Sequence, residues 1–110
     1  MSRRTEKVAA LLHKEVGEYL SRLELPVLTT ISKVEVSPDL KHSKIWVTIM
    51  GNAEKQKVVI AELAENLSDL QHELNKKLIM KFVPRIFFVA DHGEEYASHI
   101  NELLRHANEE

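Results

Sequence analysis

The chain contains no cysteine, so disulfides, thiolate nucleophiles and cysteine-ligated metal sites are all excluded. Its three glycines, Gly17, Gly51 and Gly93, lie far apart, which excludes a glycine-rich phosphate loop and a dinucleotide-binding fingerprint. No apolar run is long enough to span a membrane, and the start of the chain lacks the apolar core of a signal peptide. We therefore expect a soluble cytoplasmic protein that does not contact membranes.

Residue sets that could carry out catalysis are lacking as well. The hydroxyl side chains are scattered, and no nucleophile, base and orienting group suggest a shared site. Six histidines are present, but none belongs to an HExxH motif or has a close carboxylate partner that would complete a ligand set. We expect no enzymatic activity, no metal and no cofactor.

Length and composition predict one ordinary globular domain spanning residues 1–110. The chain is 44% hydrophobic and 29% charged, and its formal net charge is −2. The charge is unevenly distributed, because the last twenty residues hold six acids and one base, whereas residues 74–90 hold four bases and no acid. The net charge alone argues against a nucleic-acid-binding protein, but this distribution keeps that function open.

Residues 34–50 predict a β-hairpin, because apolar and polar residues alternate strictly on both sides of a polar turn. The turn is the seven-residue stretch from Ser37 to Ser43, in which Pro38 presets its own φ and Ser37 and Asp39 can bond nearby backbone groups. We expect Ser37, Pro38 and Asp39 mainly to shape the turn. The strands on either side present valines and isoleucines to one face: Val34, Val36, Ile45, Val47 and Ile49.

Two helical patterns flank the hairpin. Residues 3–21 have apolar side chains at a spacing of three and four, and a second pattern runs from an expected N-cap at Asn52 to about Lys81. Within it, Ser68 followed by Gln71 matches a capping box. This motif favours two consecutive helices, or one helix kinked near residues 66–68, over an uninterrupted helix in which Ser68 bonds back to a carbonyl.

Pro84 ends the second helical pattern, and residues 85–90 form a short apolar run. Such a run is typical of a strand buried on both faces, so we expect it at the centre of the sheet. A final amphipathic helix with glutamates in its first turn is predicted from the spacing of Tyr96, Ile100, Leu103, Leu104 and Ala107. The resulting order predicts an α+β fold in which a three-stranded sheet is packed by helices.

The basic residues are the candidates for a functional surface. If they converge in space they would bind backbone phosphates, but they would equally solvate the surface or complement helix dipoles, and the sequence pattern leaves both interpretations open. Trp46 and Phe82 have rings that can stack on bases, although we expect both in the core. The candidate RNA-binding residues are Arg3, Arg4, Lys7, Lys14, Lys41, Lys44, Lys76, Lys77, Lys81 and Arg85.

The order and spacing of several motifs resemble the ribosome-binding factor A family over residues 3–104. The motifs are Arg4-x-x-Lys7-Val8-Ala9, Leu12-x-Lys14-Glu15-Val16, Val34-x-Val36-Ser37-Pro38-Asp39-Leu40, Lys44-Ile45-x-Val47-Thr48, Val83-Pro84-x-Ile86-x-Phe88-x-x-Asp91 and Ile100-x-x-Leu103-Leu104. This resemblance implies a type II KH domain with a kink between its second and third helices. Asn66-Leu67-Ser68 takes the place of the family's Ala-x-Gly at that kink, so the glycine is missing here.

The resemblance further implies a monomeric, non-enzymatic ribosome assembly factor. It would bind the free or immature 30S subunit through 16S rRNA, assist late maturation and 5′-end processing of that RNA, and take part in cold adaptation. A different hypothesis is a KH-like protein-interaction adaptor that does not touch RNA, which the near-neutral charge and the acidic C-terminal stretch favour.

Overall fold

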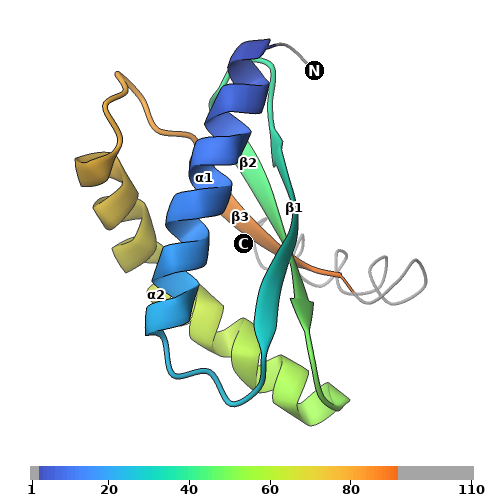
Figure 1. The fold of residues 1–110 in the computed structure, drawn as a ribbon. Helices are drawn as coiled ribbons and strands as arrows, with labels where there is room; N and C mark the ends of the chain where they lie inside the picture. Colours follow the sequence, from blue (N-terminus) through green and yellow to red (C-terminus); the bar gives the residue numbers. More distant parts are fainter. Residues whose placement is uncertain (1–2, 92–110) are drawn as a thin grey trace, which may run out of the picture.

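The computed structural model describes residues 3–91 and shows an α+β fold (Figure 1). The predicted C-terminal helix lies outside the described residues. The elements are α1 (Arg3–Arg22), β1 (Thr29–Val36), β2 (His42–Ile49), α2 (Ala53–Lys77) and β3 (Arg85–Ala90). Within the described range no helix combines the length and apolar character needed to cross a membrane.

The three strands form one sheet in the order β1-β2-β3. β1 pairs antiparallel with β2, and β2 pairs parallel with β3. The prediction that residues 85–90 form the central strand is therefore wrong, because β2 is central and β3 lies at an edge. The apolar run suggested a strand between two neighbours because it includes apolar residues on both faces. One of them, Phe87, lies on the face turned away from the core, where its ring contacts the His42 ring with a centroid separation of 5.8 Å.

The predicted hairpin is confirmed, although its boundaries differ. β1 begins at Thr29, and its register with β2 shifts between Ile31 and Lys33. The connection is Ser37–Lys41, shorter than the predicted seven residues, because His42 and Ser43 already belong to β2. Ser43 is buried opposite Val36, and its hydroxyl donates to the Arg85 carbonyl at 3.3 Å.

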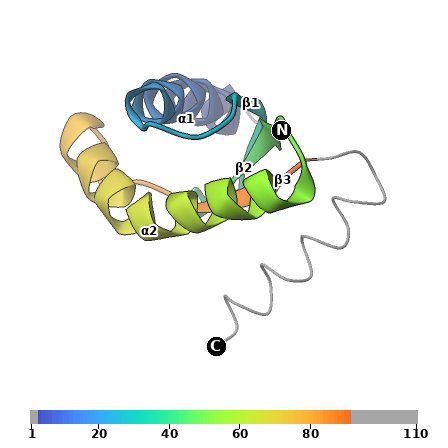
Figure 2. The ribbon, with the colours of Figure 1, turned by 90° about the horizontal axis from the view of Figure 1, so that it is seen from below.

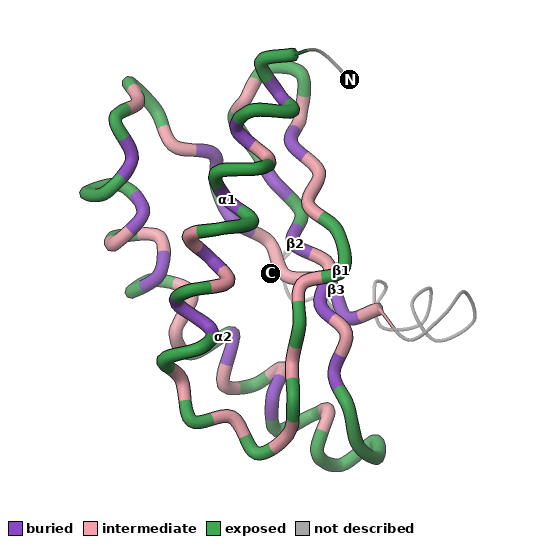
Figure 3. Tube along the Cα trace, viewed as in Figure 1, coloured by how far each residue is buried: buried purple, intermediate pink, exposed green. Residues whose placement is uncertain are grey.

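Both helices pack on the same face of the sheet, α1 near β1 and α2 near β3 (Figure 2). The inward residues of β2 are buried together with one face of each helix. Buried and exposed positions alternate along α1 and α2 in Figure 3, as amphipathic helices require. The core includes Leu12, Val16, Ile45, Val47, Val59, Leu63, Leu70, Leu74 and Ile86.

α2 is a single helix that changes direction along its length (Figures 1 and 2). The interpretation as two consecutive helices is therefore wrong, whereas a single bent helix agrees with the structure. At the predicted kink the Asn66 side-chain amide donates to the Glu62 carbonyl at 2.8 Å, competing with the helical backbone bond to that oxygen. Asn52 caps the start of α2 as predicted, its Oδ1 accepting from the Lys55 N–H at 3.0 Å.

Tyr19 of α1 reaches the same part of α2. Its hydroxyl donates to Asp69 Oδ2 at 2.7 Å and lies 3.5 Å from the Asn66 carbonyl. Burial, together with the nearby Asp69 carboxylate, raises the pKa of Tyr19 to about 12. The phenol therefore stays protonated and keeps donating to Asp69 throughout the neutral pH range.

Gln71, the residue that suggested a capping box, joins α2 to the start of β3. Its Oε1 accepts from the Ile86 N–H at 2.9 Å, and its Nε2 donates to the Pro84 carbonyl at 3.1 Å. The capping-box prediction is wrong because α2 runs without a break through Ser68. The glutamine is needed for a contact with residues far along the chain, which no local motif encodes.

Two glycines predict opposite effects on stability. An alanine Cβ at Gly17 would lie 3.8 Å from Ile31 Cδ1, an ordinary contact, so Gly17→Ala should stabilise the fold by about 0.5–1 kcal/mol through helix propensity. At Gly51, φ is +102° and the new Cβ would lie 3.2 Å from Val27 Cγ1, so Gly51→Ala should destabilise by about 1–3 kcal/mol. Urea unfolding of both variants measures the two shifts, and a loss at Gly17 would contradict the packing described here.

Gln71→Ala should destabilise the fold by about 1–3 kcal/mol, because it leaves the buried Ile86 N–H without a partner. Ser68→Ala is the matched control and should change the free energy of unfolding by less than about 0.5 kcal/mol. The midpoint of denaturant unfolding tests both. Similar losses for the two variants would favour a capping box instead.

Candidate nucleic-acid interface

The parallel pairing of β2 and β3 gathers basic residues at one end of the sheet. The Arg85 N–H donates to the Lys41 carbonyl at 2.9 Å, and Arg85 lies opposite His42 in the register. Lys44 follows two positions along β2, so it shares the face of His42 that is turned away from both helices. The backbone thus places Lys41, Lys44 and Arg85 close together, and all three are exposed.

The β1–β2 turn that carries Lys41 is fixed by its own side chains. Asp39 Oδ1 accepts from the Ser37 hydroxyl at 2.6 Å and from the Lys41 N–H at 3.1 Å, while Ser37 Oγ accepts from the His42 N–H at 3.0 Å. The Ser37 hydroxyl and the Lys41 N–H lower the pKa of the Asp39 carboxyl. Leu40 adopts a positive φ of 61° within this turn. The expectation that Ser37 and Asp39 shape the turn is confirmed.

The first turn of α1 lies at the same end of the molecule as the β1–β2 turn (Figure 1). Arg3, Arg4 and Lys7 are exposed there, and Lys14 is exposed two turns further along. The structure therefore brings the N-terminal cations of α1 and those of the sheet end to the same end of the protein, although Lys44 lies on the sheet face turned away from α1. Lys14 lies further from this end.

Lys77 is engaged within the protein. Its Nζ lies 3.5 Å from Glu15 Oε2 of α1 and 3.8 Å from Glu73 Oε1 of α2. Glu73 also accepts from Arg22 at 2.8 Å. Part of the Lys77 charge is thus used to hold α1 against α2. Lys76, its exposed neighbour, has no ion pair among the described residues.

The segment between α2 and β3 places Lys81 and two apolar side chains in solvent. Lys81 Nζ lies 5.7 Å from the centre of the Phe82 ring. Phe82 is 74% exposed and Ile79 is fully exposed, so the expectation that Phe82 belongs to the core is wrong. The sequence missed this because a phenylalanine before Val83-Pro84 looks the same whether it faces the core or solvent.

Trp46 lies on the outer face of the sheet and is only half-buried. Lys33 Nζ lies 5.9 Å from the centre of the Trp46 ring, and the indole Nε1 is buried with no hydrogen-bond partner among the described residues. The expectation that Trp46 belongs to the core is therefore also wrong. Lys33 is held in turn by Glu35 at 2.6 Å, which reduces the charge it offers to a ligand.

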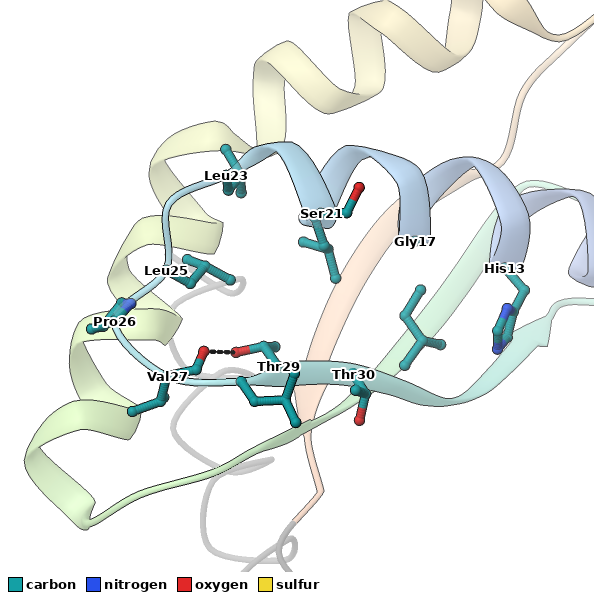
Figure 4. Close-up of a pocket in the computed structure, with 12 residues that line it drawn as sticks. His13, Gly17, Ser21, Leu23, Leu25, Pro26, Val27, Thr29 and Thr30 are labelled. Atoms are coloured by element: carbon teal, nitrogen blue, oxygen red, sulfur yellow. Dashed lines mark hydrogen bonds between the residues drawn. The ribbon is translucent and has the colours of Figure 1, made fainter.

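A groove of about 680 Å³ lies between α1 and β1 (Figure 4). Apolar side chains dominate its walls, His13 is its only titratable residue, and none of the ten predicted basic residues lines it. Nor do the described residues contain a group of three or more histidines and carboxylates able to hold a metal ion. The charged surface at the sheet end, rather than this groove, is the candidate site.

Comparisons with known proteins agree with this architecture. Residues 4–104 match the family model described as ribosome-binding factor A. A ribosome-binding factor A from Prochlorococcus marinus is 41% identical over 109 residues, covering 94% of this chain and 83% of that protein.

Solved structures show the same fold. The chain is similar to the solution structure of a putative ribosome-binding factor A from Thermotoga maritima, with a TM-score of 0.69 and 24% identity, covering 86% of this chain and 93% of that one. It is also similar to a homology model of Thermus thermophilus ribosome-binding factor A, as fitted into a cryo-EM map of a 30S complex, with a TM-score of 0.64 and 24% identity, covering 76% and 90% of the two chains. The KH-like α+β fold predicted from the sequence is confirmed.

Reversing the charge at Lys77 should lower stability, unlike the same change at Lys76. Lys77→Glu would place a carboxylate beside Glu15 and Glu73, with an expected cost of about 1 kcal/mol that shrinks as salt screens the repulsion. Lys76→Glu should change stability by less than about 0.5 kcal/mol. Denaturant unfolding at low and high salt measures both, and equal effects would mean that the Lys77 ion pairs contribute nothing.

Proposed function

The chain belongs to the ribosome-binding factor A family, and on that premise we propose that it binds the free or immature small ribosomal subunit through 16S rRNA. There it assists late maturation and 5′-end processing of the RNA as a monomeric, single-domain, non-enzymatic factor of the cytoplasm. The fitted complex of the Thermus thermophilus relative with a 30S subunit supports the choice of partner.

The observation that carries the proposal is the cluster of cations at the start of β2 and β3. Lys41, Lys44 and Arg85 are exposed, and within residues 3–91 no carboxylate lies within salt-bridge distance of them. These cations are therefore not held in ion pairs, although Glu35 lies opposite Lys44 and the Asp39 carboxylate is near Lys41. They can contact backbone phosphates, whose neutralisation supplies most of the affinity in sequence-independent RNA binding. The first turn of α1 adds Arg3, Arg4 and Lys7 at the same end of the protein (Figure 1).

The backbone beneath these side chains is already ordered, which limits the entropic cost of binding. Lys41 is fixed by its N–H bond to Asp39 and by its carbonyl bond from Arg85. Lys44 and Arg85 belong to paired strands. Only the long side chains need to become ordered when they bind phosphates. This arrangement suits a protein that docks onto a folded RNA surface.

We expect the double variant Lys41→Glu, Lys44→Glu to weaken binding to purified free small subunits by about tenfold or more at low salt, because attraction to phosphates is replaced by repulsion. Cosedimentation across a range of salt concentrations measures this. The slope of log affinity against log salt should fall by about one for each phosphate that the variant no longer neutralises.

The matched control is Lys55→Glu, Lys57→Glu, which makes the same change in net charge on exposed residues of the first turns of α2, at the opposite end of the protein (Figure 1). This control should bind close to the wild-type affinity. If both double variants weaken binding equally, the loss reflects net charge alone, and Lys41 and Lys44 do not belong to a specific binding surface. Capture of the partner that survives nuclease treatment would instead favour a protein-interaction adaptor.

A further inference from the structure

The segment between α2 and β3 is anchored at both ends and exposed in the middle. Leu78 is buried, and its N–H continues the helical pattern to the Leu74 carbonyl at 2.9 Å. Pro84 is buried at the other end, where its carbonyl accepts from Gln71 at 3.1 Å. Ile79 and Phe82 project into solvent between these anchors. The exposure of Phe82 is thus a property of a fixed backbone.

An aromatic ring that is 74% exposed on an anchored segment is unusual, because most large apolar side chains find cover on folding. Isolated exposed apolar residues need no explanation, but the Phe82 ring lies beside a cation. Lys81 Nζ lies 5.7 Å from the ring centre, and no carboxylate of the described residues pairs with Lys81 or Lys76. The partner of this segment must therefore accept an aromatic face and positive charge at once.

A nucleotide meets both requirements, since its base offers a flat π-face and its phosphate a negative charge. An apolar protein surface would cover Phe82 but would leave the ammonium group of Lys81 beside it without a partner, at a cost in desolvation. Arg85, part of the basic surface at the sheet end, follows three residues after Phe82. The segment therefore leads directly into the strand that carries Arg85.

We propose that Phe82 stacks on an unpaired base of the bound RNA while Lys81 contacts the adjacent phosphate; this rests on the proposed RNA-binding function. The base is unpaired because a base inside a continuous duplex already has both faces covered by its neighbours. Phe82 therefore directs the protein to a bulge, a loop or a single-stranded end. The basic surface supplies affinity for any RNA, and the ring adds selectivity for exposed bases.

The test uses two synthetic RNA probes of equal length, an unstructured single strand carrying one 2-aminopurine and a fully paired duplex. Phe82→Ala should weaken binding of the single strand by about 5- to 150-fold, which corresponds to about 1–3 kcal/mol per stacked base. Duplex binding and the salt dependence should stay the same, because no charge changes. The quenching of 2-aminopurine that stacking on Phe82 produces should disappear.

Three further variants separate stacking from apolar burial and from charge. Phe82→Trp should retain quenching and affinity, whereas Phe82→Leu, which keeps the apolar bulk without the π-face, should behave like Phe82→Ala. Ile79→Ala removes an apolar side chain of the same segment and should leave both probes unaffected. Lys81→Gln should weaken both probes and reduce the salt slope.

Several results would overturn the proposal. The first is that Phe82→Ala binds the single strand with wild-type affinity, and the second is that Phe82→Leu does so. The third is that the wild-type protein does not bind the single strand at low salt. Loss of small-subunit binding in Phe82→Ala with intact single-strand binding would assign the segment to a protein contact. The proposed function fails separately, through the Lys41→Glu, Lys44→Glu variant, so the two failures are distinguishable.

Discussion

The parallel pairing of β2 with β3 is the constraint on which the rest of the molecule depends. Two parallel strands need a crossover between them, and here α2 with the segment after it makes that connection across the sheet face. The same pairing aligns the starts of both strands, so the residues that enter β2 and β3 meet at one end. Lys41 and Lys44 become neighbours of Arg85, which lies far along the chain from both, because of this alignment.

Local signals in the sequence predicted the elements well, because each depends on residues close together in the chain. The alternation in residues 34–50, the Asn52 cap and the turn chemistry of Ser37 and Asp39 all correspond to hydrogen bonds between residues close in the chain or to one strand pairing with the next. The family resemblance, carried by motifs along the chain, supplied the KH-like topology. The basic residues were visible in the sequence, but not which of them the sheet would bring together.

The predictions that failed concern contacts between distant residues. The continuous apolar pattern of β3 does not distinguish a central strand from an edge strand whose outer face carries Phe87 and Val89. Gln71 matched a capping box, yet its partners are Pro84 and Ile86. In each case the residue type was correctly recognised, and the partner was decided by the tertiary fold.

Charge in this protein is divided between holding the helices together and facing outward. Arg22, Glu73, Lys77 and Glu15 form a chain of ion pairs across α1 and α2, and these charges attract a phosphate less because they are already paired. The cations at the sheet end have no such partners among the described residues.

A surface of unpaired cations binds any RNA backbone, so charge alone cannot choose a position on a large folded RNA. Selection requires groups that respond to shape or to exposed bases, and such groups act only if the backbone beneath them is fixed. The buried Leu78 and Pro84, and the Gln71 bonds that tie α2 to β3, meet that requirement next to the cations.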